Sequence, residues 1–280
     1  MQDLDRRRDL VEQRLVEVLD VVEPPTLADR SSDVVLAGGK RVRPTLAMLV
    51  CELLGGDTED ALDYAAGVEL VHNASLVVDD IIDESRLRRG SPSAWAATGH
   101  GPALITSDGL LGEALALFAD DARAMETITE SVVDLGAGEA TELMASPSDE
   151  AAYLELARRK TGALFRAAAE LGAIAVDAPP ETTDAAGTYA ERVGVAFQIR
   201  DDVLDATGDR GLLGKPAGQD AALDRPSVLE VTDLSAAEAT ERAREERDRA
   251  LAALESIEDV DPAAVDVLRD LASFAVERER

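Results

Sequence analysis

Residues 69–92 read ELVHNASLVVDDIIDESRLRRGSP, and their apolar side chains recur at helical spacing up to an aspartate pentad, Asp79-Asp80-Ile81-Ile82-Asp83. The first and last aspartates lie four residues apart, so one helix face presents two carboxylates a single turn from each other. A second pentad far along the chain, Asp201-Asp202-Val203-Leu204-Asp205, repeats the pattern. The pentads therefore predict two helices that each carry a carboxylate pair.

Carboxylate pairs of this kind favour a site for a hard cation. Mg²⁺ accepts carboxylate oxygens, keeps some waters and takes its other ligands from substrate phosphates. An acidic chain also produces carboxylate clusters by chance, and most are solvated faces. Here the flanks, Leu76-Val77-Val78 and Phe197-Gln198-Ile199, are largely apolar, and burying them beside clustered carboxylates requires a compensating charge. The pattern therefore favours a functional cation site.

The chain contains only three lysines, Lys40, Lys160 and Lys215, among 28 basic residues. Each stands beside glycine or threonine, where a substrate can approach the backbone. A compact ammonium is a good phosphate ligand, and the pair Arg88-Arg89 adds forked donors suited to phosphate. Three leftover surface lysines are the weaker alternative, so the lysines predict binding of phosphate groups.

The whole chain, residues 1–280, is expected to form one all-α domain of about ten or more helices. Hydrophobic residues make up 46% of the chain and aromatic residues only 3%, which predicts a core of Ala, Val and Leu between closely packed helices. Strand-like alternation is absent. The expected helices span residues 3–22, 40–54, 58–84, 101–117, 122–144, 149–175, 182–206, 235–256 and 262–279, with a loop at 207–226.

The formal net charge of −29 excludes some classes of partner. Such a surface repels phosphate backbones and anionic lipid, so nucleic-acid binding is not expected. Strong acidity with almost no lysine is typical of a protein kept soluble in concentrated salt, which suggests a halophilic source. No charged-then-apolar leader or transmembrane segment is expected. Cys51, the only cysteine, is predicted to pack in the core, and a reducing cytoplasm fits.

Five stretches resemble the trans-isoprenyl diphosphate synthases, the polyprenyl synthetase family, over essentially the full length of the chain. They are GGKRVRP (38–44), residues 69–92, KTGALF (160–165), FQIRDDVLDATGD (197–209) and LGKPAGQD (213–220). The resemblance implies the isoprenoid synthase fold, a helical bundle around a central cavity, and a homodimer. It implies a prenyltransferase that condenses isopentenyl diphosphate with dimethylallyl, geranyl or farnesyl diphosphate to give a longer all-trans prenyl diphosphate.

The resemblance also implies roles for individual residues. The isopentenyl diphosphate site would be made by Lys40, Arg43, His72 and Arg89. The allylic diphosphate would be held by Arg88, Lys160, Thr161, Gln198 and Lys215, and oxygens near Lys160 and Thr161 would favour the allylic cation. Asp79 and Asp83 would ligate two magnesium ions, and Asp201 with Asp205 a third. Asp80 and Asp202 would have supporting catalytic roles.

His72 has a structural alternative, because a lone histidine on an apolar helix is usually a packed core residue. It precedes Asp79 by seven residues, two helical turns along the same face, so its side chain can reach the same cavity.

Three positions depart from the family pattern. Gly138-Glu139 replaces the usual Gly-Gln, Ser107-Asp108 replaces Gly-Asp, and Arg225-Pro226-Ser227 replaces a lysine-threonine pair. These changes leave turnover rate and substrate preference open.

Three other functions compete with the synthase. A terpene cyclase of the same fold typically replaces the second pentad with an Asn/Asp-Ser/Thr-Glu motif and does not need Lys40, Arg43 or Arg89. A non-catalytic partner subunit of a synthase loses pentad ligands, whereas all six aspartates are kept here. An acidic helical cation-binding protein leaves the lysines and Arg88-Arg89 unexplained. The pattern therefore favours an active synthase.

Product length is expected to depend on the residues that precede the first pentad. Ser75 and Ala74 lie roughly 6 to 7 Å down the helix from Asp79. Related enzymes stop the chain early with large aromatic side chains here, so two small residues predict geranylgeranyl diphosphate or a product one unit longer. Alternatively, the small side chains only let neighbouring helices pack closely.

Overall fold

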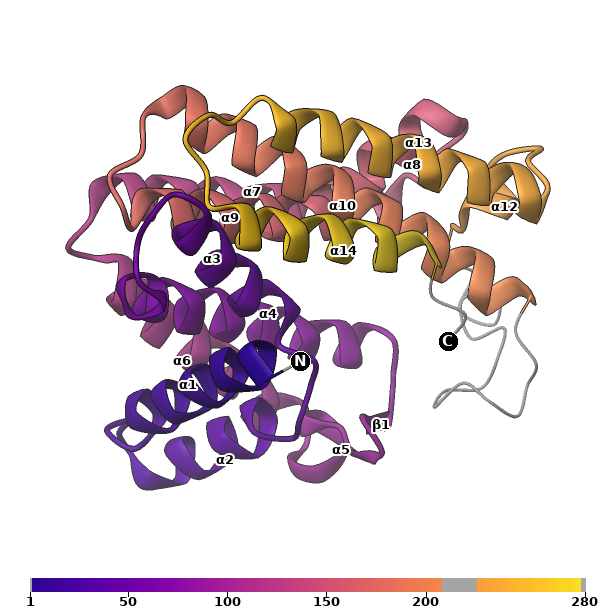
Figure 1. Cartoon of the computed structure of the whole chain (residues 1–280). Helices are drawn as coiled ribbons and strands as arrows, with labels where there is room; N and C mark the ends of the chain where they lie inside the picture. The colour runs from indigo at the N-terminus through magenta and orange to yellow at the C-terminus, as the bar shows by residue number, and fades with distance from the viewer. Residues whose placement is uncertain (1, 208–225, 278–280) are drawn as a thin grey trace.

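The computed structural model describes residues 2–207 and 226–277, and within them the fold is all-α, as predicted (Figure 1). The only strands in this part of the chain are β1 (Leu87–Arg88) and β2 (Ser91–Pro92), a minimal antiparallel hairpin. The helices are α1 (Gln2–Leu19), α2 (Pro25–Val35), α3 (Val42–Leu53), α4 (Leu62–Ile82), α5 (Ala94–Thr98), α6 (His100–Phe118), α7 (Ala122–Met144), α8 (Glu150–Ala157), α9 (Ala163–Ile174), α10 (Pro180–Thr207), α12 (Val228–Val231), α13 (Ala236–Glu255) and α14 (Pro262–Glu277).

Most predicted helices are confirmed, with boundaries within a few residues. Helix α2 was missed, because Pro24-Pro25 was taken only as a break, whereas Pro25 occupies the first turn of α2, where proline is well tolerated. The helix predicted at 149–175 is interrupted by a π-helical turn, η2 (Arg158–Gly162), between α8 and α9. A short 3₁₀ segment, η1 (Thr58–Ala61), precedes α4. Most of the predicted loop 207–226 lies outside the described residues.

Helix α9 is at the centre of the molecule, where it packs against α3, α4, α7 and α10. Its buried side chains are mostly small, including Ala167, Ala168, Ala169 and Ala173, so the surrounding helices approach closely. The core is built largely from Ala, Val and Leu, as the composition predicts. Because α4 and α10 carry the two pentads and both pack against α9, the pentads are held on one rigid framework.

The cysteine lies in this framework as predicted. Cys51 is fully buried, and burial together with Asp60 and Glu52 raises the pKa of its thiol to about 12, so the thiol is inert packing material. In the upper part of Figure 1, α13 runs beside α10 and closes the core on that side. None of the described helices is long and apolar enough to cross a membrane.

Candidate active site

A buried ion pair anchors the GGKRVRP segment to α4. Arg41, 2% exposed, donates from Nη1 to Glu69 Oε1 at 2.7 Å and from Nη2 to the Val35 carbonyl at 2.7 Å. Asn73 Nδ2 also donates to Glu69 Oε1 at 3.1 Å, so the buried carboxylate is well satisfied. This network fixes the start of α3 against α4. The sequence reasoning assigned no role to Arg41 or Glu69.

Arg43 and His72, both predicted to bind isopentenyl diphosphate, are in direct contact. Arg43 Nη1 lies 3.2 Å from His72 Nε2, and the Arg43 guanidinium stacks 4.8 Å from the ring centroid of Phe165 on α9. Burial lowers the pKa of Arg43 to about 10, and Nε is a buried donor with no hydrogen-bond partner. An unsatisfied buried donor on a cation is well suited to donate a hydrogen bond to an anionic ligand.

Arg89 joins this cluster through the glycine loop. It donates from Nη1 to the Gly38 carbonyl, and its guanidinium lies against Gly39. A Cβ at Gly39 would come 3.0 Å from Arg89 Cζ, and the φ of +140° at Gly39 also disfavours any side chain. Glycine is therefore required where Arg89 crosses the loop. The structure thus brings together three of the four residues predicted for isopentenyl diphosphate.

His72 is held in its neutral form by this environment. Burial and then the charges of Arg43, Arg89, Arg88 and Arg41 hold its pKa well below 6.5. Because arginine has only donors, Nε2 of His72 must act as an acceptor, with the proton on Nδ1. Since the folded pKa is depressed, the associated stability is present above about pH 6.5 and is lost as the pH falls toward the folded pKa.

The His72 ring is expected to stay neutral in the free protein down to about pH 6. In the free protein, its NMR signals should show no titration between pH 8 and pH 6, whereas bound isopentenyl diphosphate should raise its pKa by offsetting the arginine charges. Side-chain histidine NMR over that range measures this, with His72→Gln used to assign the signal because the chain has 2 histidines. A ring that titrates near its ordinary pKa in the free protein contradicts the site.

The second aspartate of the first pentad has a structural partner. Asp80 is 3% exposed, and its carboxylate accepts from Nε of Arg88 at 3.0 and 3.2 Å. This pair ties the segment after α4 back to the helix and leaves Arg88 partly exposed beside the pentad. Asp79 and Asp83 are only partly buried. Asp80 therefore holds Arg88 beside the first pentad, and its supporting catalytic role stays a prediction.

Asp202, the second aspartate of the second pentad, is likewise buried and bonded to partners outside the pentad. It is 4% exposed and accepts from Tyr153 at 2.7 Å, Gln198 at 2.9 Å and the backbone N–H of Val228 at 2.8 Å. Thr161 Oγ1 in turn donates to Gln198 Oε1 at 2.7 Å. A continuous chain of hydrogen bonds therefore orients the predicted allylic-site residues Thr161 and Gln198. Tyr153 was missed because no local sequence pattern links it to a residue 49 positions away.

Lys160 lies in the π-helical turn η2, whose irregular backbone often marks a functional site. Its ammonium pairs with Glu139 at 3.1 Å and with Glu142, both on α7. Neither glutamate was predicted as a site residue. Their positions three residues apart on a helix were a signal that could have been noticed.

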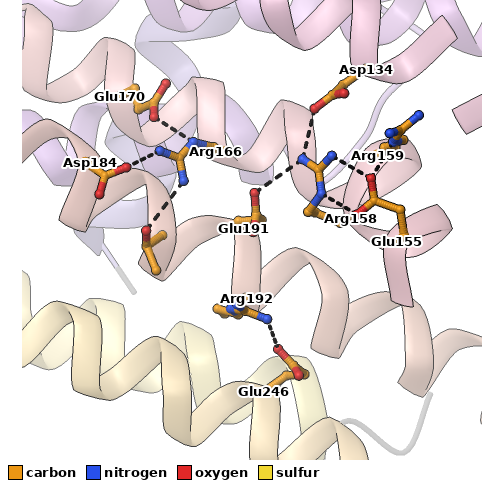
Figure 2. A network of polar contacts seen from close by, with 11 residues as sticks. Asp134, Glu155, Arg158, Arg159, Arg166, Glu170, Asp184, Glu191, Arg192 and Glu246 are labelled. Atoms are coloured by element: carbon orange, nitrogen blue, oxygen red, sulfur yellow. Dashed lines mark hydrogen bonds and ion pairs between the residues drawn. The ribbon is translucent and has the colours of Figure 1, made fainter. Parts of the chain in front are cut away.

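An ion-pair network braces η2 against its neighbours (Figure 2). Arg158 contacts Asp134 on α7 at 2.9 Å, Glu155 on α8 at 2.9 Å and Glu191 on α10 at 3.8 Å. A single guanidinium thus connects three helices around the turn that carries Lys160 and Thr161. Several ion pairs that share one arginine restrict its side chain more than an isolated surface pair does. The network therefore helps to fix the position of Lys160.

The remaining predicted residues are placed as follows. Lys40 is exposed, with Nζ 5.6 Å from the ring centroid of Phe274 on α14, and among the described residues no hydrogen bond or ion pair joins it to the Arg43 cluster. Asp201 is exposed and Asp205 partly exposed, both near the end of α10. Lys215 lies outside the described residues.

The two positions predicted to control product length face different surroundings. Ala74 is 5% exposed, belongs to the hydrophobic core, and its carbonyl accepts from Ser107 Oγ on α6 at 2.9 Å. Ser75 is more exposed and donates to the carbonyl of His72 at 2.9 Å. A cavity of about 560 Å³ lies beside α4, where Leu76, Val77 and Asp80 line it together with Arg88.

The donor set suits magnesium only with substrate present. Within the described parts of the chain, no group of three or more His, Cys, Asp or Glu side chains comes together to hold a metal ion. Each pentad offers two carboxylates on one helix, since Asp80 and Asp202 are engaged elsewhere. This arrangement fits a cation that completes its shell with water and phosphate oxygens.

Comparison with known proteins agrees with this geometry. The model of the polyprenyl synthetase family matches residues 24–265. This chain belongs to the polyprenyl synthetase family. A short chain isoprenyl diphosphate synthase from Methanothermobacter thermautotrophicus is 34% identical over 253 residues, which cover 87% of this chain and 78% of the relative.

Solved structures of the family share the fold over the whole length. Geranylgeranyl pyrophosphate synthetase from Pyrococcus horikoshii superposes with a TM-score of 0.91 at 30% identity, covering 99% of this chain and 98% of that one. A polyprenyl synthase from Caulobacter crescentus, complexed with calcium and isoprenyl diphosphate, gives 0.88 at 27% identity and covers 100% and 97%. This polyprenyl synthetase therefore has the isoprenoid synthase fold and elongates prenyl diphosphates.

Proposed function

We propose that this prenyl synthase is magnesium-dependent and makes mainly geranylgeranyl diphosphate from isopentenyl diphosphate and a shorter allylic primer. The observation that carries the proposal is the pairing of two groups of residues on one framework. Arg43 and Arg89 form a cationic cluster with His72 of α4, and Thr161 of η2 forms a hydrogen-bonded chain with Gln198 and Asp202 of α10. A synthase needs two separate diphosphate sites, whereas a cyclase needs only one.

Each of the two substrates has its own set of binding residues. Arg43, His72 and Arg89 bind isopentenyl diphosphate, and Arg88, Lys160 and Lys215 hold the allylic diphosphate, with its charge facing cations. Thr161 and Gln198 place oxygens near the reacting carbon, which favours the allylic cation left when the diphosphate departs. The isopentenyl double bond then attacks, and the proton lost in the last step passes to the released diphosphate.

We assign the metal ions to Asp79 and Asp83 at the C-terminal end of α4 and to Asp201 and Asp205 on α10, three Mg²⁺ per site. Bound there, they would supply positive charge to the departing diphosphate. The carboxylate donor set supports this assignment. So does the calcium and isoprenyl diphosphate complex of the Caulobacter crescentus relative.

One assay tests the function directly. The purified protein is incubated with MgCl₂, isopentenyl diphosphate and each allylic primer in turn, and the alcohols are identified after dephosphorylation. Geranylgeraniol as the main product, with none when EDTA replaces MgCl₂, is the expected result. Cyclic products made from an allylic diphosphate alone would indicate a cyclase, and no product from any primer would indicate a non-catalytic subunit.

We further propose that two copies of the chain associate through α6 and α7. Large apolar side chains are exposed on both helices, including Ile105 at 59%, Val133 at 66% and Met144 at 84%. Such exposure in a strongly charged chain is characteristic of an interface, and a two-fold dimer covers the same patch on both copies.

Charged substitutions on this face are expected to convert the proposed dimer to a monomer. The double variant Ile105→Glu with Val133→Glu should elute as a monomer, because four buried carboxylates would oppose association. Light scattering coupled to size exclusion measures the mass. Val21→Glu, at a side chain 75% exposed after α1, is the control and should stay dimeric. A dimeric double variant would place the interface elsewhere.

The charge of −29 supports a cytoplasm rich in salt as the place of action. Because added salt screens the repulsion between like charges, the melting temperature should rise as KCl increases from dilute to molar. Thermal melts followed by circular dichroism across that range measure this. A melting temperature that stays flat or falls would reject the halophilic assignment.

A further inference from the structure

Helix α7 approaches the π-helical turn closely enough to place two carboxylates on Lys160. A Cβ added at Gly138 would come 3.1 Å from the backbone N of Lys160, so glycine is what permits this approach. The next residue, Glu139, then lies 3.1 Å from the Lys160 ammonium, and Glu142 contacts it from the following turn. The contact is well shielded, because Lys160 is 17% exposed and Glu139 is 16% exposed.

These two contacts reverse the local charge at Lys160. One ammonium faces two carboxylates, so the three groups together carry a net negative charge. Glu139 Oε2 is buried and has no hydrogen-bond partner, which means that this carboxylate is not fully neutralised by its surroundings. Part of the attraction that the Lys160 ammonium offers to a diphosphate is therefore already taken up by its contact with Glu139.

We propose that Glu139 is a positioning residue that acts through Lys160 to weaken the hold of the enzyme on the allylic diphosphate and on released inorganic diphosphate. The inference rests on the proposed function, which places the allylic diphosphate at Lys160. Glu139 orients the ammonium and offsets part of its charge. Bound diphosphate consequently leaves faster than it would from an unopposed lysine, and the KM for the allylic substrate is higher.

The substitution Glu139→Gln isolates the charge. Glutamine keeps an oxygen that accepts from Lys160 but removes the negative charge from the site. Binding of inorganic diphosphate in the presence of MgCl₂, measured by calorimetry at low salt, should tighten by about fivefold to tenfold. Because salt screens charge, the difference between variant and parent should shrink in molar KCl.

Two control variants separate charge from shape. Glu139→Asp keeps the charge and should bind diphosphate within about twofold of the parent, whereas a purely steric role for the side chain would make Asp the more damaging change. Glu126→Gln removes an exposed carboxylate of the same helix, α7, outside the ion-pair network around η2. It should leave diphosphate affinity unchanged.

Steady-state kinetics and a double-mutant cycle test whether Glu139 acts through Lys160. Glu139→Gln should lower the KM for the allylic substrate with little change in the KM for isopentenyl diphosphate. In the background of Lys160→Met, the same change should have a much smaller effect on diphosphate binding, since the coupled group is gone. Unchanged or weaker diphosphate binding by a folded Glu139→Gln protein overturns the inference, as does an equal effect in both backgrounds. If the parent makes no prenyl product from any primer, the proposed function fails instead.

Discussion

Replacing Asp79 or Asp201 with alanine is expected to lower the rate of condensation about a thousandfold or more while the protein stays folded. Each change removes a proposed ligand of a cation whose charge on the departing diphosphate contributes several kcal/mol to catalysis. The fold should survive because neither side chain is buried: Asp79 is partly exposed and Asp201 is exposed. Steady-state rates with saturating magnesium and both substrates measure the effect, with circular dichroism as the check on folding.

The neighbouring aspartates provide a contrast within the same pentads. Asp80 and Asp202 are buried with charged or polar partners, so alanine there should remove the carboxylate to which Arg88 or Tyr153 donates and lower the melting temperature as well as activity. Asp63→Ala, at an exposed carboxylate in the first turn of α4, is the matched control and should keep both. Activity of Asp79→Ala or Asp201→Ala within tenfold of the parent would remove the metal assignment.

A phenylalanine at position 75 is expected to shift the main product from geranylgeranyl to farnesyl or geranyl diphosphate. Ser75 lies on α4 one turn before Asp79, is partly exposed, and bonds to the carbonyl of His72, a residue of the candidate site. A ring at this position should enter the space along which the tail extends from the pentad. Chromatography of the dephosphorylated products measures the shift.

The same substitution one residue earlier should behave differently. Ala74 is buried in the core, with Ser107 of α6 bonded to its carbonyl, so Ala74→Phe has no free space to fill. Overpacking of this kind typically costs about 1–3 kcal/mol, and we expect a lower melting temperature with little change in product length. If Ser75→Phe is well folded and leaves the products unchanged, this part of α4 does not set their length. A shorter product from a stable Ala74→Phe protein would assign that role to Ala74.

The sequence was sufficient for the fold class, most helix positions and the family, whereas the roles of the individual site residues stay predictions. Helical periodicity is a local signal, so α7 and α13 are confirmed nearly to the residue. The pentads and the three lysines are also local patterns, because carboxylates at helical spacing and cations beside glycine limit the ligands that a segment can bind. The missed helix α2 and the π-helical turn are local features whose signals were ambiguous, since proline can begin a helix as well as end one.

Partners far apart in the chain were decided only by the tertiary structure. Nothing near Asp202 in sequence indicates Tyr153, and the contact of Lys160 with Glu139 depends on α7 approaching η2 at Gly138. Likewise, Ala74 and Ser75 are equivalent as small residues on a helix, and only the packing of α6 buries the first and leaves the second accessible. A side chain's neighbours depend on how helices pack, and helix packing is a property of the whole core that no single segment encodes.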